Sequence, residues 1–158
     1  MTFKIRKAKA SESKLLSNLA LRLKAYWGYS QKFIDTCWQE ITYSKEYIQN
    51  NYVFVAEDEN NILGFYSLKL FINTADIELD ALFIEPSCIK QAYGRKLIEH
   101  AKFISRKLKK QNMVIFGNPN TKDFYLKVGA KFVGKRKSDT FSNRYLPIFT
   151  LSLAEVDN

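Results

Sequence analysis

The spacing of apolar residues along this chain switches between a two-residue period and a helical period, and these switches predict its secondary structure. Alternating or continuous apolar stretches predict strands over residues 3–7, 52–57, 62–71, 75–84, 113–116 and 146–153, with a short strand after Gly129. Helical spacing predicts helices that open at Ser11 and Ser30, a turn or more over 44–50, a helix after Pro86 and a short helix after Pro119. The polar residues 58–61 predict a hairpin turn between two strands.

Residues 82–101, LFIEPSCIKQAYGRKLIEHA, are the most informative stretch. They combine an apolar strand, a proline stop, a tight loop and a helix. A helix start leaves backbone N–H groups without intrahelical partners, and its dipole favours negative charge, so a loop at this point can bind a phosphate. Lys90, Arg95 and Lys96 add positive charge there. A plain strand-to-helix connection is the alternative interpretation.

A second segment, 118–134, follows the apolar run that ends at Phe116. Its proline suits the first turn of a helix, and Phe124, Tyr125 and Val128 fall at helical spacing. Gly129 suits the left-handed residue that ends a helix. The segment therefore predicts a short helix followed by a strand.

Taken in this order, the two segments resemble the GNAT superfamily of acetyl-CoA-dependent N-acyltransferases. The signature of that family is a phosphate loop Gln/Arg-x-x-Gly-x-Gly/Ala and a later Asn-Pro…Phe-Tyr…Gly. The order of predicted elements agrees over nearly the whole chain. The resemblance implies one α/β (α+β) domain over 1–158, with a mixed, mostly antiparallel sheet of about seven strands flanked by about four helices and splayed between the fourth and fifth strands.

Length and composition agree with a single folded domain. The chain has 158 residues, of which 46% are hydrophobic and 15% aromatic, enough to fill a core. No apolar run approaches the roughly 20 residues of a membrane helix, and the N-terminus lacks the apolar part of a signal peptide, so we expect a cytoplasmic protein without a membrane partner. Cys37 and Cys88 lie far apart, and with His100 as the single histidine we expect free thiols and no metal site.

The formal charge of +9 admits two anionic partners. One is nucleic acid, and the other is a polyanionic cofactor such as CoA. The basic residues are scattered, and one dense run over 106–110 falls where a helix should end and complements its dipole. The sequence contains no nucleic-acid-binding motif, so nucleic acid is the weaker interpretation.

The predicted fourth strand carries the candidate base. Its two-residue period puts Glu78 and Asp80 on one face before the strand turns continuously apolar. By resemblance, the backbone of Leu82, Phe83 and Ile84 would pair with the pantetheine arm of the cofactor, and a backbone N–H there would polarise the thioester carbonyl.

An acceptor amine that arrives charged must lose a proton before it can attack, and Glu78 is our candidate for that base. A solvated carboxylate, or one paired with a lysine, is the alternative. Tyr125 matches the family's tyrosine, whose phenol can donate to the departing thiolate. A ring packed beside Phe124 is the alternative, and the preceding Asn118-Pro119 favours the acid. By the same resemblance Asn118 would hydrogen-bond the pantetheine arm, against the alternative of helix capping.

The phosphate loop departs from the family pattern. Ile89 replaces the usual Gln or Arg, and Ala92 replaces the first glycine, which is tolerable if its φ is negative. The resemblance implies that the cofactor contacts Ile89, Lys90, Gln91, Ala92, Tyr93, Gly94 and Arg95. The departure leaves open a member that binds CoA without catalysis.

The acceptor is the least determined part of the site. By resemblance it would lie near Trp27, Tyr29, Glu78, Arg144 and Tyr145, and aromatic packing is the alternative for the first two. A small amine or a peptide amine would both suit these residues, and a homodimer is also open. The sequence therefore predicts first an N-acetyltransferase, second a CoA-binding sensor module, and third a basic nucleic-acid-binding domain.

Overall fold

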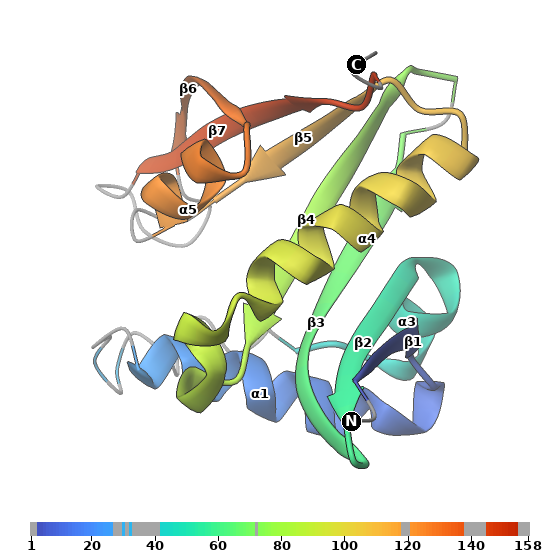
Figure 1. Cartoon of the computed structure of the whole chain (residues 1–158), viewed down its shortest axis with the longest axis vertical. Helices are drawn as coiled ribbons and strands as arrows, with labels where there is room; N and C mark the ends of the chain where they lie inside the picture. Colours follow the sequence, from blue (N-terminus) through green and yellow to red (C-terminus); the bar gives the residue numbers. More distant parts are fainter. Residues whose placement is uncertain are drawn as a thin grey trace. The chain divides into compact units, whose positions relative to one another are not determined.

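The computed structural model describes residues 3–26, 30, 32, 42–71, 73–117, 121–137 and 145–154 (Figure 1). The chain divides into two compact units, which are described separately. Unit 1 comprises Met1–Ser67 and Ala81–Leu97, and unit 2 comprises Leu68–Asp80 and Ile98–Asn158.

The strands form one seven-stranded sheet in the order β1-β2-β3-β4-β5-β7-β6. The pairs β1–β2, β5–β7 and β6–β7 are antiparallel, whereas β4 and β5 are parallel. The predicted mixed, mostly antiparallel sheet is confirmed. The strands are β1 (Lys4–Lys7), β2 (Tyr52–Asp58), β3 (Asn61–Leu70), β4 (Asp76–Ile84), β5 (Asn112–Phe116), β6 (Lys131–Lys137) and β7 (Tyr145–Ser152).

Four α-helices and two 3₁₀ helices lie within the described residues. The α-helices are α1 (Ser13–Tyr26), α3 (Lys45–Asn50), α4 (Tyr93–Lys107) and α5 (Lys122–Lys127), and the 3₁₀ helices are η1 (Ala10–Glu12) and η2 (Pro86–Gln91). The helix predicted to open at Ser11 starts as η1 and becomes α1 at Ser13. The helix predicted after Ser30 lies outside the described residues. No helix in the described ranges is long and apolar enough to cross a membrane.

Unit 1 has an apolar core between α1, α3 and the strands β2 and β3. Leu16 and Leu19 of α1 are fully buried with Val55 and Phe65, as the helical spacing of the leucines predicts. The helix α3 begins where Ser44 accepts a hydrogen bond from the N–H of Tyr47, an ordinary N-cap.

The predicted hairpin between β2 and β3 is confirmed. Its two turn residues, Glu59 and Asn60, both have positive φ, of 51° and 70°. Two such residues define the type I′ turn, whose twist matches that of the flanking strands.

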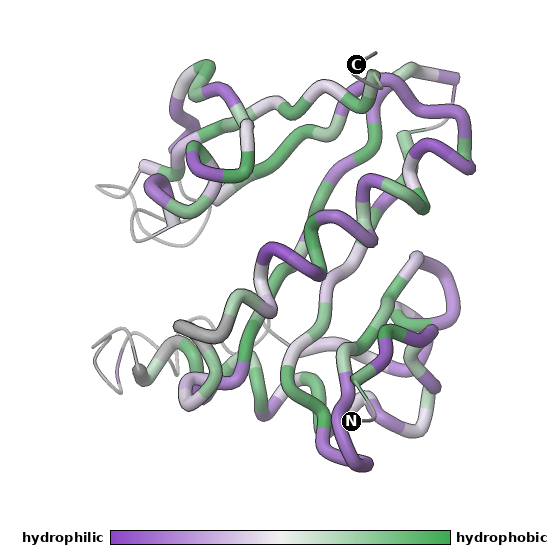
Figure 2. The backbone as a smooth tube through the Cα atoms, in the orientation of Figure 1, coloured by the Kyte–Doolittle hydropathy of each residue, from purple (hydrophilic) through white to green (hydrophobic). Residues whose placement is uncertain are grey.

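Unit 2 has a sheet with one buried face. Ile77 and Leu79 of β4 lie beside Met113 and Ile115 of β5, and all four are buried. Phe149 of β7 continues this face. The helix α5 covers it through Tyr125, which packs on Phe149. In Figure 2 the β5 segment has mostly the hydrophobic colour. Gly129, with φ of 98°, ends the turn after α5 as predicted.

The ladder between β4 and β5 is short. Among the described residues it joins Asp76–Leu79 to Asn112–Ile115, although β5 continues to Phe116 and β4 continues past Leu79. The backbone groups of β4 beyond Leu79 therefore leave this parallel ladder, and the predicted splay between the fourth and fifth strands is confirmed.

Candidate functional site

The predicted phosphate loop lies in unit 1, at the end of β4. The backbone N–H of Glu85 donates to Leu63 O at 2.7 Å, and the Glu85 carboxylate forms an ion pair with Arg22 of α1 at 2.6 Å. Pro86 then opens η2, and α4 begins at Tyr93. The segment predicted as a tight loop is therefore a 3₁₀ helix whose entry is fixed by a hydrogen bond and an ion pair.

Ala92 does not meet the condition under which an alanine would be tolerable in this loop, a negative φ. It ends η2 in the left-handed region, with φ of 64° and ψ of 13°. The chain must reverse there between η2 and α4, and a left-handed residue achieves this reversal. A Cβ disfavours the conformation, so the glycine of the family pattern would be the less strained residue at this position.

The first turn of α4 has the features of an anion site. The N–H of Lys96 donates to Ala92 O at 3.2 Å, so the N–H groups of the three preceding residues come before the first bond of the helix. Gly94 is buried, and the Arg95 side chain is exposed. The donors and the positive charge therefore suit a phosphate group.

Tyr93, the first residue of α4, is held by an aromatic stack. Its ring lies on Phe3 with centroids 5.3 Å apart, and Lys96 Nζ lies 4.6 Å from the centre of the Phe3 ring. The side chains of Ile89, Lys90 and Gln91 lie outside what the structure describes, while their backbone belongs to η2.

The last residues of β4, Leu82, Phe83 and Ile84, are half-buried in unit 1. The Phe83 ring packs against Phe65, with centroids 5.5 Å apart. A Cβ at Gly64 would lie 2.7 Å from Phe83 O, so the absence of a side chain at Gly64 lets β3 approach this part of β4 closely.

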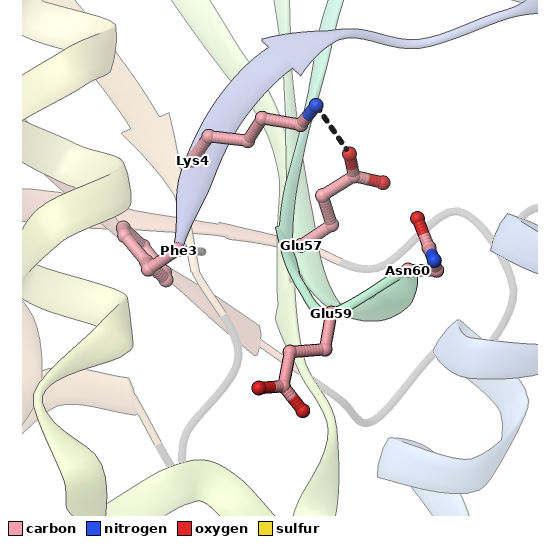
Figure 3. A pocket seen from close by; sticks show the side chains of 5 residues that line it. All are labelled: Phe3, Lys4, Glu57, Glu59 and Asn60. Carbon is pink, nitrogen blue, oxygen red and sulfur yellow. Dashed lines mark ion pairs between the residues drawn. The ribbon is translucent and has the colours of Figure 1, made fainter. Parts of the chain in front are cut away.

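An open depression in unit 1 is lined by five residues (Figure 3). They are Phe3, Lys4, Glu57, Glu59 and Asn60. Lys4 reaches across it to form a 3.2 Å ion pair with Glu57, which also pairs with Arg6 at 3.1 Å. The charges of Lys4 and Glu57 are thus engaged in ion pairs that join β1 to β2.

Unit 2 contains the candidate base. Glu78 and Asp80 are half-buried on one face of β4, as the two-residue period predicts, while Ile77, Leu79 and Ala81 between and beside them are buried. Burial, a hydrogen bond with Asp80 and the negative charge of Asp80 raise the pKa of Glu78 to about 7. The carboxyl group is therefore poised to exchange a proton near neutral pH.

Two cations act on the same carboxyl. Lys69 of β3 and Arg136 of β6 oppose the rise in the Glu78 pKa through their positive charge. The guanidinium carbon of Arg136 lies 4.1 Å from the centre of the Phe116 ring. A charged cluster thus extends from β4 to the end of β5.

Tyr125 of α5 lies on the other face of the sheet. Its ring is 5% exposed and packs on Phe149 with centroids 5.2 Å apart. A Cβ at Gly117 would lie 3.4 Å from Tyr125 Cε2, which places the ring at the end of β5, where the ladder with β4 has stopped. Burial raises the pKa of the phenol, so it keeps its proton at neutral pH.

Several predicted residues lie outside the described part of the chain. They are Trp27, Tyr29, Asn118 and Arg144. Tyr145 is described, and it is 56% exposed at the start of β7, opposite Lys137. Cys88 is a free thiol, as expected, whereas Cys37 is not described. Within the described ranges, no cluster of His, Cys, Asp or Glu could hold a metal ion.

The sequence analysis missed Lys69, Phe116 and Arg136. The first two lie within the predicted strands 62–71 and 113–116 and belong to no motif. Arg136 was missed because the register of β6 against β7 shifts by one residue between Phe132 and Gly134, a β-bulge that changes the face of every later side chain.

Comparison with known proteins identifies the class. Residues 49–129 match the acetyltransferase (GNAT) domain family, which is half of the chain. The chain belongs to this family of acetyltransferases. No curated protein matches it.

Solved structures with low sequence identity share the fold. The PaiA N-acetyltransferase of Thermoplasma acidophilum, in complex with coenzyme A, is 21% identical with a TM-score of 0.79, over 96% of this chain and 99% of that chain. An aminoglycoside 6'-N-acetyltransferase complexed with coenzyme A is 16% identical with a TM-score of 0.74, over 100% of both chains. YncA of Salmonella typhimurium, with acetyl-CoA, is 14% identical with a TM-score of 0.70, over 100% of this chain and 98% of that chain.

The left-handed Ala92 leads to a stability prediction. Ala92→Gly should raise the free energy of unfolding by about 0.5–1 kcal/mol, because relief of the strained φ outweighs the extra entropy of glycine in the unfolded chain. Urea denaturation measures the change. Ala101→Gly, in the middle of α4, is the control and should lower stability instead. An Ala92→Gly variant less stable than the wild type would contradict the assigned conformation.

Proposed function

We propose that this chain is an N-acetyltransferase that transfers the acetyl group of acetyl-CoA to a primary amine by direct attack within a ternary complex. One observation carries the proposal. At the point where β4 and β5 stop pairing, a carboxyl group with a pKa of about 7 lies on one face of the sheet and a buried phenol lies on the other. Amide formation from a thioester is helped by a base that deprotonates the amine and by an acid that protonates the departing thiolate, and these two groups suit those roles.

The first turn of α4 supports a role in holding the cofactor diphosphate. Its N–H groups precede the helical ladder, and Arg95 adds charge. The backbone of Leu82, Phe83 and Ile84, and the amide of Asn118, would bind the pantetheine arm by family resemblance. Bound in this way, the cofactor supplies an activated acetyl thioester.

The residues of unit 2 would then move the protons. Glu78 accepts a proton from the acceptor ammonium, and the freed lone pair attacks the thioester carbonyl carbon. The carbon–nitrogen bond forms as the carbon–sulfur bond breaks with its electron pair on sulfur. Tyr125 would donate its phenolic proton to that sulfur, and the new amide nitrogen would release its second proton to solvent. The phenolate would then recover a proton from solvent, and Glu78 would release the proton that it accepted.

A sensor module that binds CoA without turnover is the second candidate, and the strained alanine of the phosphate loop favours it. The raised pKa of Glu78 favours the enzyme, because a structural carboxylate gains nothing from a pKa near neutrality. A thiol-release assay against pooled primary amines separates the two. Cofactor binding without thiol release from any amine would leave the sensor.

The pKa of Glu78 predicts the pH dependence of the rate. Because the pKa is raised, Glu78 is protonated and inactive as a base below about pH 7, so kcat should rise with pH through an inflection near 7. Glu78→Gln should lower kcat about 100-fold and abolish the inflection. Asp80→Asn removes two of the causes of the raised pKa, so it should move the inflection to lower pH. An inflection unmoved in Asp80→Asn would show that another group controls the rate.

Tyr125→Phe removes the proposed acid while keeping the ring that packs on Phe149. We expect kcat to fall about 10- to 100-fold with little change in the Kd for acetyl-CoA. Tyr52→Phe in β2 removes the same atom elsewhere and serves as the control. Steady-state kinetics together with cofactor titration decide the point, and an unchanged kcat would leave Tyr125 with a packing role alone.

A further inference from the structure

The bulge in β6 turns Arg136 toward the face of unit 2 that carries the carboxylates. Phe132 is opposite Phe149 of the buried face, but after the extra residue Val133, Gly134 is opposite Ile148 and Arg136 is opposite Leu146. In a regular strand Arg136 would share the face of Phe132, four residues earlier. Bulges that redirect a side chain in this way are common beside active sites.

The strand registers show that Arg136 and Glu78 share this face. Glu78 pairs with Val114, Phe116 lies two residues after Val114 on the same side, and Phe116 pairs with Ile148. Val114, Phe116 and Ile148 are all half-exposed, in contrast to the buried opposite face. A half-exposed surface therefore runs from the carboxylates of β4 to the arginine of β6.

The Arg136 side chain reaches back along this surface. Its guanidinium carbon lies 4.1 Å from the centre of the Phe116 ring, on the strand next to β4. The cation is close enough to β4 for its charge to act on Glu78, and it joins none of the ion pairs formed by the described residues. A guanidinium held over a ring keeps its N–H edge available for a planar anion.

We propose that Arg136 determines acceptor specificity by binding a carboxylate on the acceptor amine, so that the substrates are small amines that carry a carboxylate, such as amino acids. The inference rests on the proposed acetyl transfer at the same site. Glu78 and Asp80 receive the ammonium end of such a molecule, and Arg136 receives its carboxylate end. The two ends of the surface thus match the two charges of one zwitterion.

Of the other cations of β6, Lys131, opposite Thr150, shares the face of Arg136, but among the described residues only Lys69 and Arg136 contribute positive charge that lowers the pKa of Glu78. The other two lie on the opposite face. Lys135 is opposite Pro147, on the other face of the strand, and Lys137 is opposite Tyr145 on that same face. Lys135 therefore provides a matched control. Lys135→Gln also removes one positive charge, at the residue next to Arg136 but on the opposite face of the strand.

The test compares amines that differ in one group. Purified wild type, Arg136→Gln and Lys135→Gln are assayed with acetyl-CoA and with glycine, β-alanine and glutamate against their carboxamides, with rates corrected for the fraction of free amine. The wild type should prefer at least one acid to its amide by about 10- to 100-fold in kcat/KM. Arg136→Gln should lose that preference through a higher KM for the acid, and Lys135→Gln should keep it. Because Arg136 also lowers the pKa of Glu78, all rates are compared at a pH well above 7, where Glu78 is ionised in each protein.

A binding measurement separates this inference from the proposed activity. The same acids and amides are titrated calorimetrically into each protein saturated with CoA. Arg136-dependent binding of an acid without any thiol release would uphold the carboxylate site while rejecting the acetyl transfer. Acetylation of amides as fast as acids by the wild type, a preference retained in Arg136→Gln, or failure of all the acids to bind would overturn the role of Arg136.

Discussion

Backbone pairing between β4 and β5 ends at Leu79 and Ile115, and the proposed chemistry depends on that ending. In a continuous parallel sheet, the two faces are separated by hydrogen-bonded backbone, and a substrate could meet only one of them. Here the ladder stops next to Asp80 on one strand and Phe116 on the other. In the proposed mechanism, Glu78 on the half-exposed face and Tyr125 against the buried face act on the two sides of one reacting group.

Burial raises the pKa of both proposed acid–base groups, with different consequences for Glu78 and Tyr125. Glu78 is half-buried beside a second carboxyl, so its charged form is disfavoured and its pKa rises to about 7. Tyr125 is buried among Phe124, Phe149 and the backbone of Gly117, so its phenol stays protonated and can only donate. Arg136 limits the rise in the pKa of Glu78 and, in our proposal, also binds the carboxylate of the acceptor. One charged face thereby links proton transfer to substrate choice.

The sequence predicted the features that depend on local patterns. Alternation in β4 placed Glu78 and Asp80 on one face, and Gly129 marked the left-handed end of α5, because both follow from the chain's own periodicity and φ preferences. It did not predict the features that a neighbouring element imposes. The φ of Ala92 is set by the reversal between η2 and α4, and the face of Arg136 is set by a bulge against β7, neither of which leaves a local signal in an alanine or a basic strand.

The central claim is that the phosphate loop, despite its alanine, still binds the cofactor. Calorimetric titration of the purified protein with acetyl-CoA tests it most directly, with Gly94→Glu beside the wild type. The account predicts saturable binding by the wild type and at least about tenfold weaker binding by Gly94→Glu, because the new carboxylate would repel the diphosphate. Gly134→Glu adds the same charge where a Cβ would meet nothing within 4 Å and should bind as the wild type does. No binding at millimolar acetyl-CoA, or an unchanged affinity in Gly94→Glu, would contradict the account.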